Sequence, residues 1–166
     1  MISTKKEVGL VKTFEEEHHI WTIAEVIAFY QKAFPDMDII KIKLSYKGQF
    51  LRYKIIGQDL TIRQTLQMNA QTGGVLTEES KYLSPKECAN QENEFIQIDN
   101  LLSLNEITAV AKSIYPDYRP YKGEIKREHD QTIYQIDLVD DHLEYKAVLK
   151  VDAQDGTVLN SIEKNK

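Results

Sequence analysis

The chain repeats itself, and this internal repeat constrains its fold more than any single residue does. Residues 22–25 read Thr-Ile-Ala-Glu, and the related Ser-Leu-Asn-Glu follows 81 residues later at 103–106. Near the ends of the two copies, Asn-Ala-Gln-Thr-Gly at 69–73 corresponds to Asp-Ala-Gln-Asp-Gly at 152–156. Self-similarity of this kind predicts two related structural units in one chain.

Each unit begins with a helix signature. Thr22 and Ser103 each precede a glutamate by three residues, which is the pattern of a capping box. Pro35 and Pro116 follow at matched positions, and proline cannot continue a helix. The sequence therefore predicts two helices, at about 23–33 and about 104–114.

After each proline the apolar residues alternate with polar ones, as expected for strands with one buried face. The first unit shows three such runs, at about 40–46, 51–55 and 62–70. The second unit shows three more, at about 123–127, 134–138 and 145–151. We therefore predict an α+β protein of two tandem lobes, each with one helix packed on a three-stranded antiparallel sheet.

The predicted organisation has four parts. We assign 1–20 to a leader or anchor-proximal segment, 21–80 to the first lobe, 81–97 to a linker and 98–166 to the second lobe. Small lobes bury little core, and exposed strand edges invite pairing. We expect the lobes to pack as a pseudo-symmetric pair, with four apolar residues beside the linker buried at the junction: Tyr82, Leu83, Phe95 and Ile96.

Composition excludes several classes of protein. The net charge of −5 disfavours nucleic-acid partners, which need clustered Lys and Arg. No apolar run reaches the roughly 18–20 residues that span a bilayer, and no signal peptide is evident. Either the protein is cytoplasmic or an anchor has been removed. Cys88 is the single cysteine, which rules out an internal disulfide and favours a structural thiol.

Catalytic and metal-binding patterns are not found. The sequence lacks a His-Glu-x-x-His motif, a Gly-rich phosphate loop and a Gly-x-Ser-x-Gly motif. His18 and His19 favour a solvated leader over a metal site, because adjacent histidines point in different directions. The acidic residues near 137–144 lack the order of an EF-hand and favour a solvated hairpin. We expect no catalysis, no metal and no cofactor.

Three tyrosines near prolines form the candidate partner surface: Tyr115, Tyr118 and Tyr121. Aromatic side chains on a loop often serve recognition. The alternative is that they cover the end of the helix–sheet core.

The pattern resembles the PepSY family. The second copy carries Pro116, the Tyr-Gln-Ile segment at 134–136 and the closing motif Val-Asp-Ala-Gln-Asp-Gly-Thr-Val-Leu at 151–159. The first copy has Asn69 where that motif places an acid. A second resemblance is to the two-lobed, cystatin-like cell-wall regulator proteins of Gram-positive bacteria.

The PepSY resemblance implies an extracytoplasmic bacterial protein, secreted or attached to the membrane as a lipoprotein or by a single anchor outside this sequence. It implies a non-catalytic binding module that restrains or regulates a peptidase or another cell-envelope enzyme. The alternative function is a small-ligand sensor or carrier that uses a groove between helix and sheet. A filled groove would favour protein partners, and a polar pocket would favour a ligand.

Overall fold

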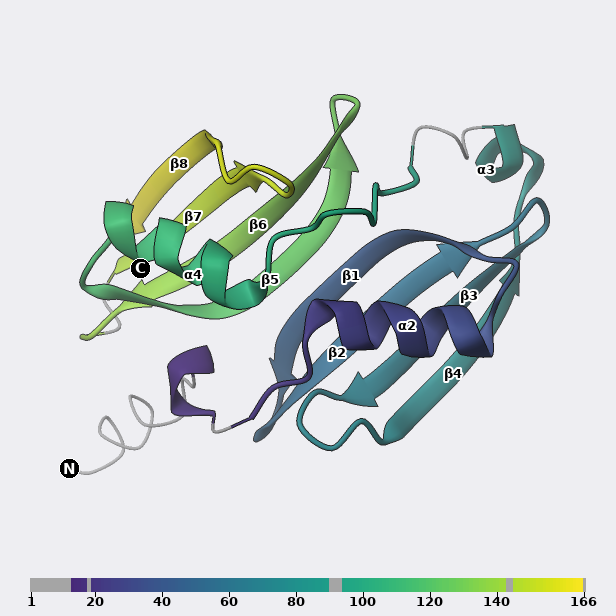
Figure 1. Ribbon diagram of the computed structural model, residues 1–166, viewed down its shortest axis with the longest axis horizontal. Helices are drawn as coiled ribbons and strands as arrows, with labels where there is room; N and C mark the ends of the chain where they lie inside the picture. The colour runs from purple at the N-terminus through teal and green to yellow at the C-terminus, as the bar shows by residue number, and fades with distance from the viewer. Residues whose placement is uncertain (1–12, 18, 90–93, 143–144, 166) are drawn as a thin grey trace.

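The protein forms one eight-stranded antiparallel sheet with two helices on one of its faces (Figure 1). The computed structural model describes residues 13–17, 19–89, 94–142 and 145–165. The strand order is β4-β3-β2-β1-β5-β6-β7-β8, so each repeat supplies four neighbouring strands. The two repeats meet where β1 pairs with β5.

The elements of the two repeats correspond one to one. The first repeat comprises α2 (Ile23–Ala33), β1 (Asp38–Lys47), β2 (Phe50–Gln58), β3 (Ile62–Asn69) and β4 (Val75–Tyr82). The second comprises α4 (Leu104–Ile114), β5 (Tyr118–Glu128), β6 (Gln131–Asp140), β7 (Tyr145–Asp152) and β8 (Val158–Asn165). A 3-10 turn, η1 (Phe14–Glu16), precedes the first repeat, and a short helix, α3 (Pro85–Ala89), lies between the two.

The predicted fold class is wrong in two respects: the protein is mostly β, and its strands form one sheet instead of two three-stranded ones. Each repeat has a fourth strand, β4 or β8, that the alternation of apolar residues did not reveal. All eight residues of β4 are exposed, and β4 is an edge strand of the sheet. A strand exposed on both faces carries no period-two signal.

The second error is the separation of the lobes. β1 and β5 pair antiparallel over five residues, from Lys41 opposite Lys126 to Ser45 opposite Lys122. Each of these strands would otherwise present an open edge of backbone N–H and C=O groups. Their pairing satisfies both edges at once, which side-chain patterns alone could not foretell.

Both predicted capping boxes are confirmed. The Thr22 hydroxyl accepts a hydrogen bond from the Glu25 N–H at 3.1 Å, and the Glu25 carboxylate accepts one from the Thr22 N–H at 2.8 Å. Ser103 and Glu106 form the same pair of bonds at 3.1 Å and 2.9 Å. The helix boundaries agree with the predicted ranges.

The repeated tyrosine of each unit fastens the start of its helix to the sheet. The Tyr53 hydroxyl donates to the Trp21 carbonyl at 2.6 Å, and the Tyr134 hydroxyl donates to the Leu102 carbonyl at 2.8 Å. Both tyrosine side chains lie in the core under the helices. Burial raises the pKa of both phenols well above its usual range, so they act as hydrogen-bond donors at all ordinary pH values.

The closing turn of each repeat forms a backbone hydrogen bond with the residue that precedes the helix cap. The Trp21 N–H donates to the Ala70 carbonyl at 2.7 Å, and the Leu102 N–H donates to the Ala153 carbonyl at 2.9 Å. Within the second turn the Asp152 carboxylate accepts from the backbone of residues 154 and 155 at 2.8 Å and 3.0 Å. Asn69 makes the equivalent bonds in the first turn at the same distances. The closing motif is therefore a structural device.

The segment between the repeats behaves only partly as predicted. Ile96 is buried, and its N–H donates to the Ile39 carbonyl at 3.0 Å. Phe95 and Leu83 are half-buried. Tyr82 is 81% exposed, so its predicted burial at the junction is wrong. It ends the edge strand β4, and this strand lies on the far side of the first repeat from β5.

Gly73 provides a test of the packing of the Trp21 ring against the closing turn of the first repeat. Its φ of 78° is costly for any residue with a side chain, and a Cβ there would overlap the Trp21 ring. We expect Gly73→Ala to lower the free energy of unfolding by more than the ~1–2 kcal/mol that left-handed backbone alone costs. Urea denaturation measures this. Gly48→Ala is the matched control, because Gly48 has φ of 62° and open space around it; equal losses would contradict the packing argument.

Asp152 should make stability depend on acid pH. The hydrogen bond from Gln131 lowers the pKa of Asp152, helped by the two backbone N–H groups of its turn. A carboxyl whose pKa is lower in the folded chain than in the unfolded chain stabilises the fold when the pH is above the unfolded-state pKa of about 3.9. This stabilisation is lost as the pH falls through the folded-state pKa.

Asp152→Asn keeps the turn, as Asn69 shows in the first repeat. We expect the variant to melt below the parent protein at neutral pH and to converge with it near about pH 2. Thermal melts followed by circular dichroism across this range measure the difference. A gap that stays constant down to the lowest pH would mean that the charge of Asp152 contributes nothing.

Candidate functional site

The three tyrosines predicted as a partner surface do not form one surface. Tyr118 is buried, and its hydroxyl donates to the Glu163 carboxylate of β8. This bond raises the pKa of Tyr118 to about 12. The half-buried Tyr115 ring packs beside it, with 5.2 Å between the ring centroids. These two rings close the end of the core beneath α4, which was the alternative interpretation.

Tyr121 lies apart from the other two. It occupies the irregular register of β5 between Pro120 and Lys122. The Lys146 Nζ lies 5.6 Å from the centroid of its ring, within the range of a cation–π contact. Lys146 alternates along β7 with Ala147, which is in the core. Tyr121 is therefore on the face of the sheet that carries no helix.

The groove between helix and sheet is filled. Val26 and Tyr30 of α2 have no exposed surface, and neither do Ile107 and Ala111 of α4. These side chains belong to one core cluster that extends through both repeats. The interface beneath each helix thus leaves no room for a small ligand.

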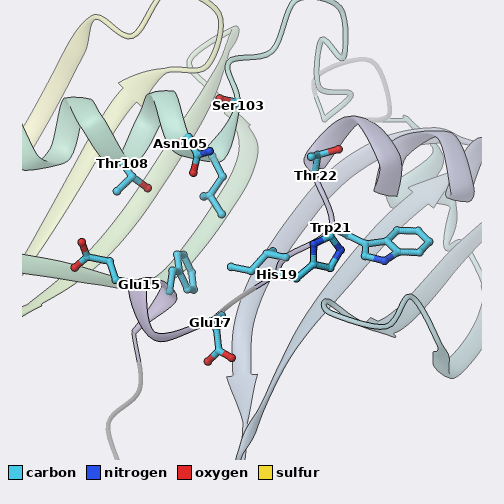
Figure 2. Close-up of a pocket in the computed structure, with 11 residues that line it drawn as sticks. Glu15, Glu17, His19, Trp21, Thr22, Ser103, Asn105 and Thr108 are labelled. Atoms are coloured by element: carbon cyan, nitrogen blue, oxygen red, sulfur yellow. The ribbon is translucent and has the colours of Figure 1, made fainter.

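A hollow of about 440 Å³ opens instead between the starts of the two helices. Figure 2 shows its three sides: the beginning of α4, the segment that leads into α2, and η1. Eleven residues line it: Phe14, Glu15, Glu17, His19, Ile20, Trp21, Thr22, Ser103, Leu104, Asn105 and Thr108. Residues of both repeats contribute, so the hollow exists only because β1 and β5 place the two helix starts on one side of the sheet.

Specific contacts hold the η1 wall of the hollow in place. The Tyr46 hydroxyl of β1 donates to the Thr13 carbonyl at 2.8 Å and lies 2.6 Å from a Glu17 carboxylate oxygen. The Lys112 ammonium of α4 pairs with the Glu15 carboxylate at 3.0 Å. Phe14 is buried, and its ring lies 6.4 Å from that of Tyr46. This segment therefore bridges the two repeats.

The hollow offers hydrogen-bonding groups over an apolar base. The capping glutamates accept from the backbone N–H groups of Thr22 and Ser103, the residues just before the two helices, and the bond from the Thr22 N–H lowers the pKa of Glu25. The exposed Asn105 and His19 and the half-buried Thr108 remain as polar groups at the rim. Such an arrangement suits recognition of a polar chain.

The remaining sequence candidates have structural partners or fall outside the described part. The Asp140 carboxylate accepts from the Tyr145 N–H at 3.1 Å, and Asp141 pairs with Arg119 at 3.3 Å. The Cys88 thiol donates to the Leu60 carbonyl at 3.1 Å. His18 and Glu144 lie outside the described residues. Among the described residues, no three His, Cys, Asp or Glu side chains gather as metal ligands.

Comparison with known proteins establishes the fold and no family. The sequence matches no family model, and no curated protein matches it. The structure is similar to the crystal structure of a candidate lipoprotein from Clostridium difficile 630, with a TM-score of 0.83. The two chains are 18% identical, and the match covers 92% of this chain and 99% of the other. Fold similarity at this identity does not transfer a function.

In the part of the chain that the structure describes, no helix is long and apolar enough to cross a membrane.

Tyr46 provides a test of the hollow's η1 wall. We expect Tyr46→Phe to release residues 13–17 from β1, because the hydroxyl is the group that reaches Thr13 and Glu17. Amide hydrogen exchange should then quicken in this segment while the sheet keeps its protection. The exposed Tyr82 supplies the control Tyr82→Phe, which should change neither. Unchanged exchange at residues 13–17 would show that the other contacts of the segment, such as the burial of Phe14 and the Lys112–Glu15 pair, hold it without this hydroxyl.

Proposed function

We propose that this protein is a non-catalytic, extracytoplasmic binding module that regulates a protein partner, such as a peptidase or another cell-envelope enzyme. The observation that carries the proposal is the filled interface beneath both helices, where Val26, Tyr30, Ile107 and Ala111 have no exposed surface. A module that stored a small ligand between helix and sheet would need space there. A module that meets a protein does not.

Two further observations support the proposed extracytoplasmic location and the proposed relation to PepSY domains. A solved structure with this fold is a candidate lipoprotein, a class of protein held outside the cytoplasm by a lipid anchor. The two repeats also carry the features by which the sequence resembles PepSY domains: the short helix, the proline after it, the buried tyrosine and the closing turn. We therefore propose a tandem of PepSY-like units that share one sheet.

The contact site in this proposal is the hollow between the helix starts. Its rim presents Asn105 and His19, and Ile20 and Leu104 line it with apolar surface. An apolar centre surrounded by polar groups is typical of protein interfaces. A segment of the partner that crosses the hollow would touch both repeats at once.

A small-ligand sensor remains the second candidate function, and its ligand site is then this hollow instead of the groove between helix and sheet. Its volume of about 440 Å³ is within the range of ligand pockets, roughly 300–1,000 Å³. The exposure of Asn105 and Ser103 at its rim favours a partner that covers the site from outside over a ligand enclosed within it.

Inhibition assays on purified peptidases test the proposal. The protein should slow hydrolysis by at least one secreted metallopeptidase of its own organism, and Asn105→Arg should weaken that inhibition at least tenfold because the new side chain fills the hollow. Ala109→Arg is the matched control, since Ala109 is exposed on α4 but does not line the hollow. Equal effects of both variants would contradict the proposed contact site.

A panel of envelope peptidases and cell-wall hydrolases that is unaffected by the protein would contradict the regulatory role itself. Calorimetric titration with small metabolites then tests the small-ligand sensor. That function predicts a saturable heat of binding, which Asn105→Arg should abolish.

A further inference from the structure

The face of the sheet opposite the helices carries a cluster of positive charge at its centre. In an antiparallel sheet, directly paired residues point to the same face. Lys43 of β1 is paired with Lys54 of β2, and Ser45 is paired with Arg52 on one side and Lys122 on the other. Lys41 precedes Lys43 by two positions and therefore shares this face. We call these five residues the basic face: Lys41, Lys43, Arg52, Lys54 and Lys122.

The buried residues of β1 show that the basic face is on the side of the sheet opposite the helices. Ile42 and Leu44 alternate with the lysines of β1, and both are buried in the cluster beneath the helices. No helix covers the basic face in the described part of the chain (Figure 1). With strands about 4.8 Å apart and alternate residues about 6.8 Å apart, the basic face measures roughly 10 by 14 Å.

Most of the positive charge on this face is not neutralised by the protein itself. None of the four lysines Lys41, Lys43, Lys54 and Lys122 forms an ion pair with a carboxylate of the described residues. Glu124, which is paired with Lys43 across β1 and β5, is held by Lys126 at 3.1 Å. Asp137 lies opposite Lys122 at the border.

Burial, followed by the nearby charge of Lys122, lowers the pKa of Lys43. Lys54 and Lys41 lower it as well, while the Glu124 carboxylate acts in the opposite direction. The Arg52 guanidinium donates to the Gln67 side chain through one nitrogen, while its buried Nε has no hydrogen-bond partner among the described residues. A chain of net charge −5 thus concentrates unpaired cations on one flat face.

The residue types indicate what this face meets. Protein interfaces are poor in lysine and rich in Tyr, Trp and Arg at their centres, whereas lysine dominates here. Lysine ammonium groups are flexible point charges that suit phosphate groups without a fixed arrangement. At the margin, Phe50 is paired with Lys47 on the same face and is 38% exposed. Lysines beside an exposed phenylalanine are typical of surfaces that lie on a lipid interface.

We propose that the basic face docks on an anionic lipid surface, with its lysines above the phosphate groups and Phe50 at the level of the headgroups. This contact is separate from the hollow, which opens on the other side of the sheet. The protein would then lie flat on the membrane with the helix starts turned outward. The inference does not depend on the proposed function, because it concerns a different face.

Sedimentation with lipid vesicles tests the proposal on the full chain. The protein should bind vesicles of phosphatidylglycerol and phosphatidylcholine in equal parts and should not bind pure phosphatidylcholine. Each lysine near an anionic surface contributes about fivefold to binding, so Lys43→Gln with Lys54→Gln should weaken it about 25-fold. High salt should weaken it as well, because exposed charges are screened.

The matched control removes the same charge from the helix side. Lys32 is exposed in the last turn of α2, so Lys32→Glu, which changes the net charge by the same two units, should leave vesicle binding within about twofold, since this position does not face the lipid. Equal losses in Lys32→Glu and in the double variant of the basic face would mean that net charge alone drives binding and would overturn the proposal. If the first pair melts early, Lys47→Gln with Lys54→Gln replaces it, because Lys47 is exposed to solvent.

Phe50→Ala separates a lipid surface from a soluble polyanion. Its loss should weaken binding to the vesicles and leave binding to inorganic polyphosphate unchanged. Binding to polyphosphate without binding to vesicles would overturn the proposal in favour of an anionic polymer. Failure of all vesicle binding would leave the hollow and its peptidase assays unaffected, so the two proposals fail separately.

Discussion

The pairing of β1 with β5 is the contact on which the rest of this structure depends. Over five residues it joins two repeats that would each have had an open inner edge. It makes one core from two small ones, because residues of both helices and of both halves of the sheet belong to the same cluster. It also creates both candidate surfaces. The hollow needs the two helix starts side by side, and the basic face needs Lys122 of β5 next to the lysines of β1 and β2. Without this ladder there would be two small domains and neither surface.

The strongest motifs of the sequence turn out to serve the fold. The repeated tyrosine, the capping box and the closing turn all act on one place in each unit, where the chain enters its helix. Tyr53 and Tyr134 bind the carbonyl of the residue before the cap, and the alanine of the closing turn accepts the N–H of that same residue. Matched bonds in the two copies differ by at most about 0.2 Å in length, so the duplicated motif is a duplicated anchoring device. Function must then be sought where the copies differ or meet.

The two faces of the sheet have opposite characters. One face carries the helices, the buried core and the outward hollow, with acidic residues such as Glu15 and Glu17 at its edge. The other has a centre rich in unpaired lysine. This asymmetry gives the flat molecule an orientation that neither its net charge nor its composition reveals. A protein that lies with its lysines toward an anionic surface would leave its hollow free for a partner, so the two proposals are compatible although they are tested separately.

The sequence by itself determined the local structure of this protein. The two helices and their caps, the strands with one buried face and the tight turns all follow from residue spacing, because hydrogen bonds between neighbours and the burial of one face act within about 20 residues.

Tertiary structure alone decided the rest. The edge strand β4 and residues 158–163 of β8 gave no alternation because both of their faces meet solvent, and Tyr118 looked like a surface residue until Glu163, 45 positions away, was placed against it. The single sheet, the hollow and the basic face arise from backbone pairing between β1 and β5. Every residue except proline offers the same backbone N–H and C=O groups, and so side-chain patterns cannot specify which edges will meet.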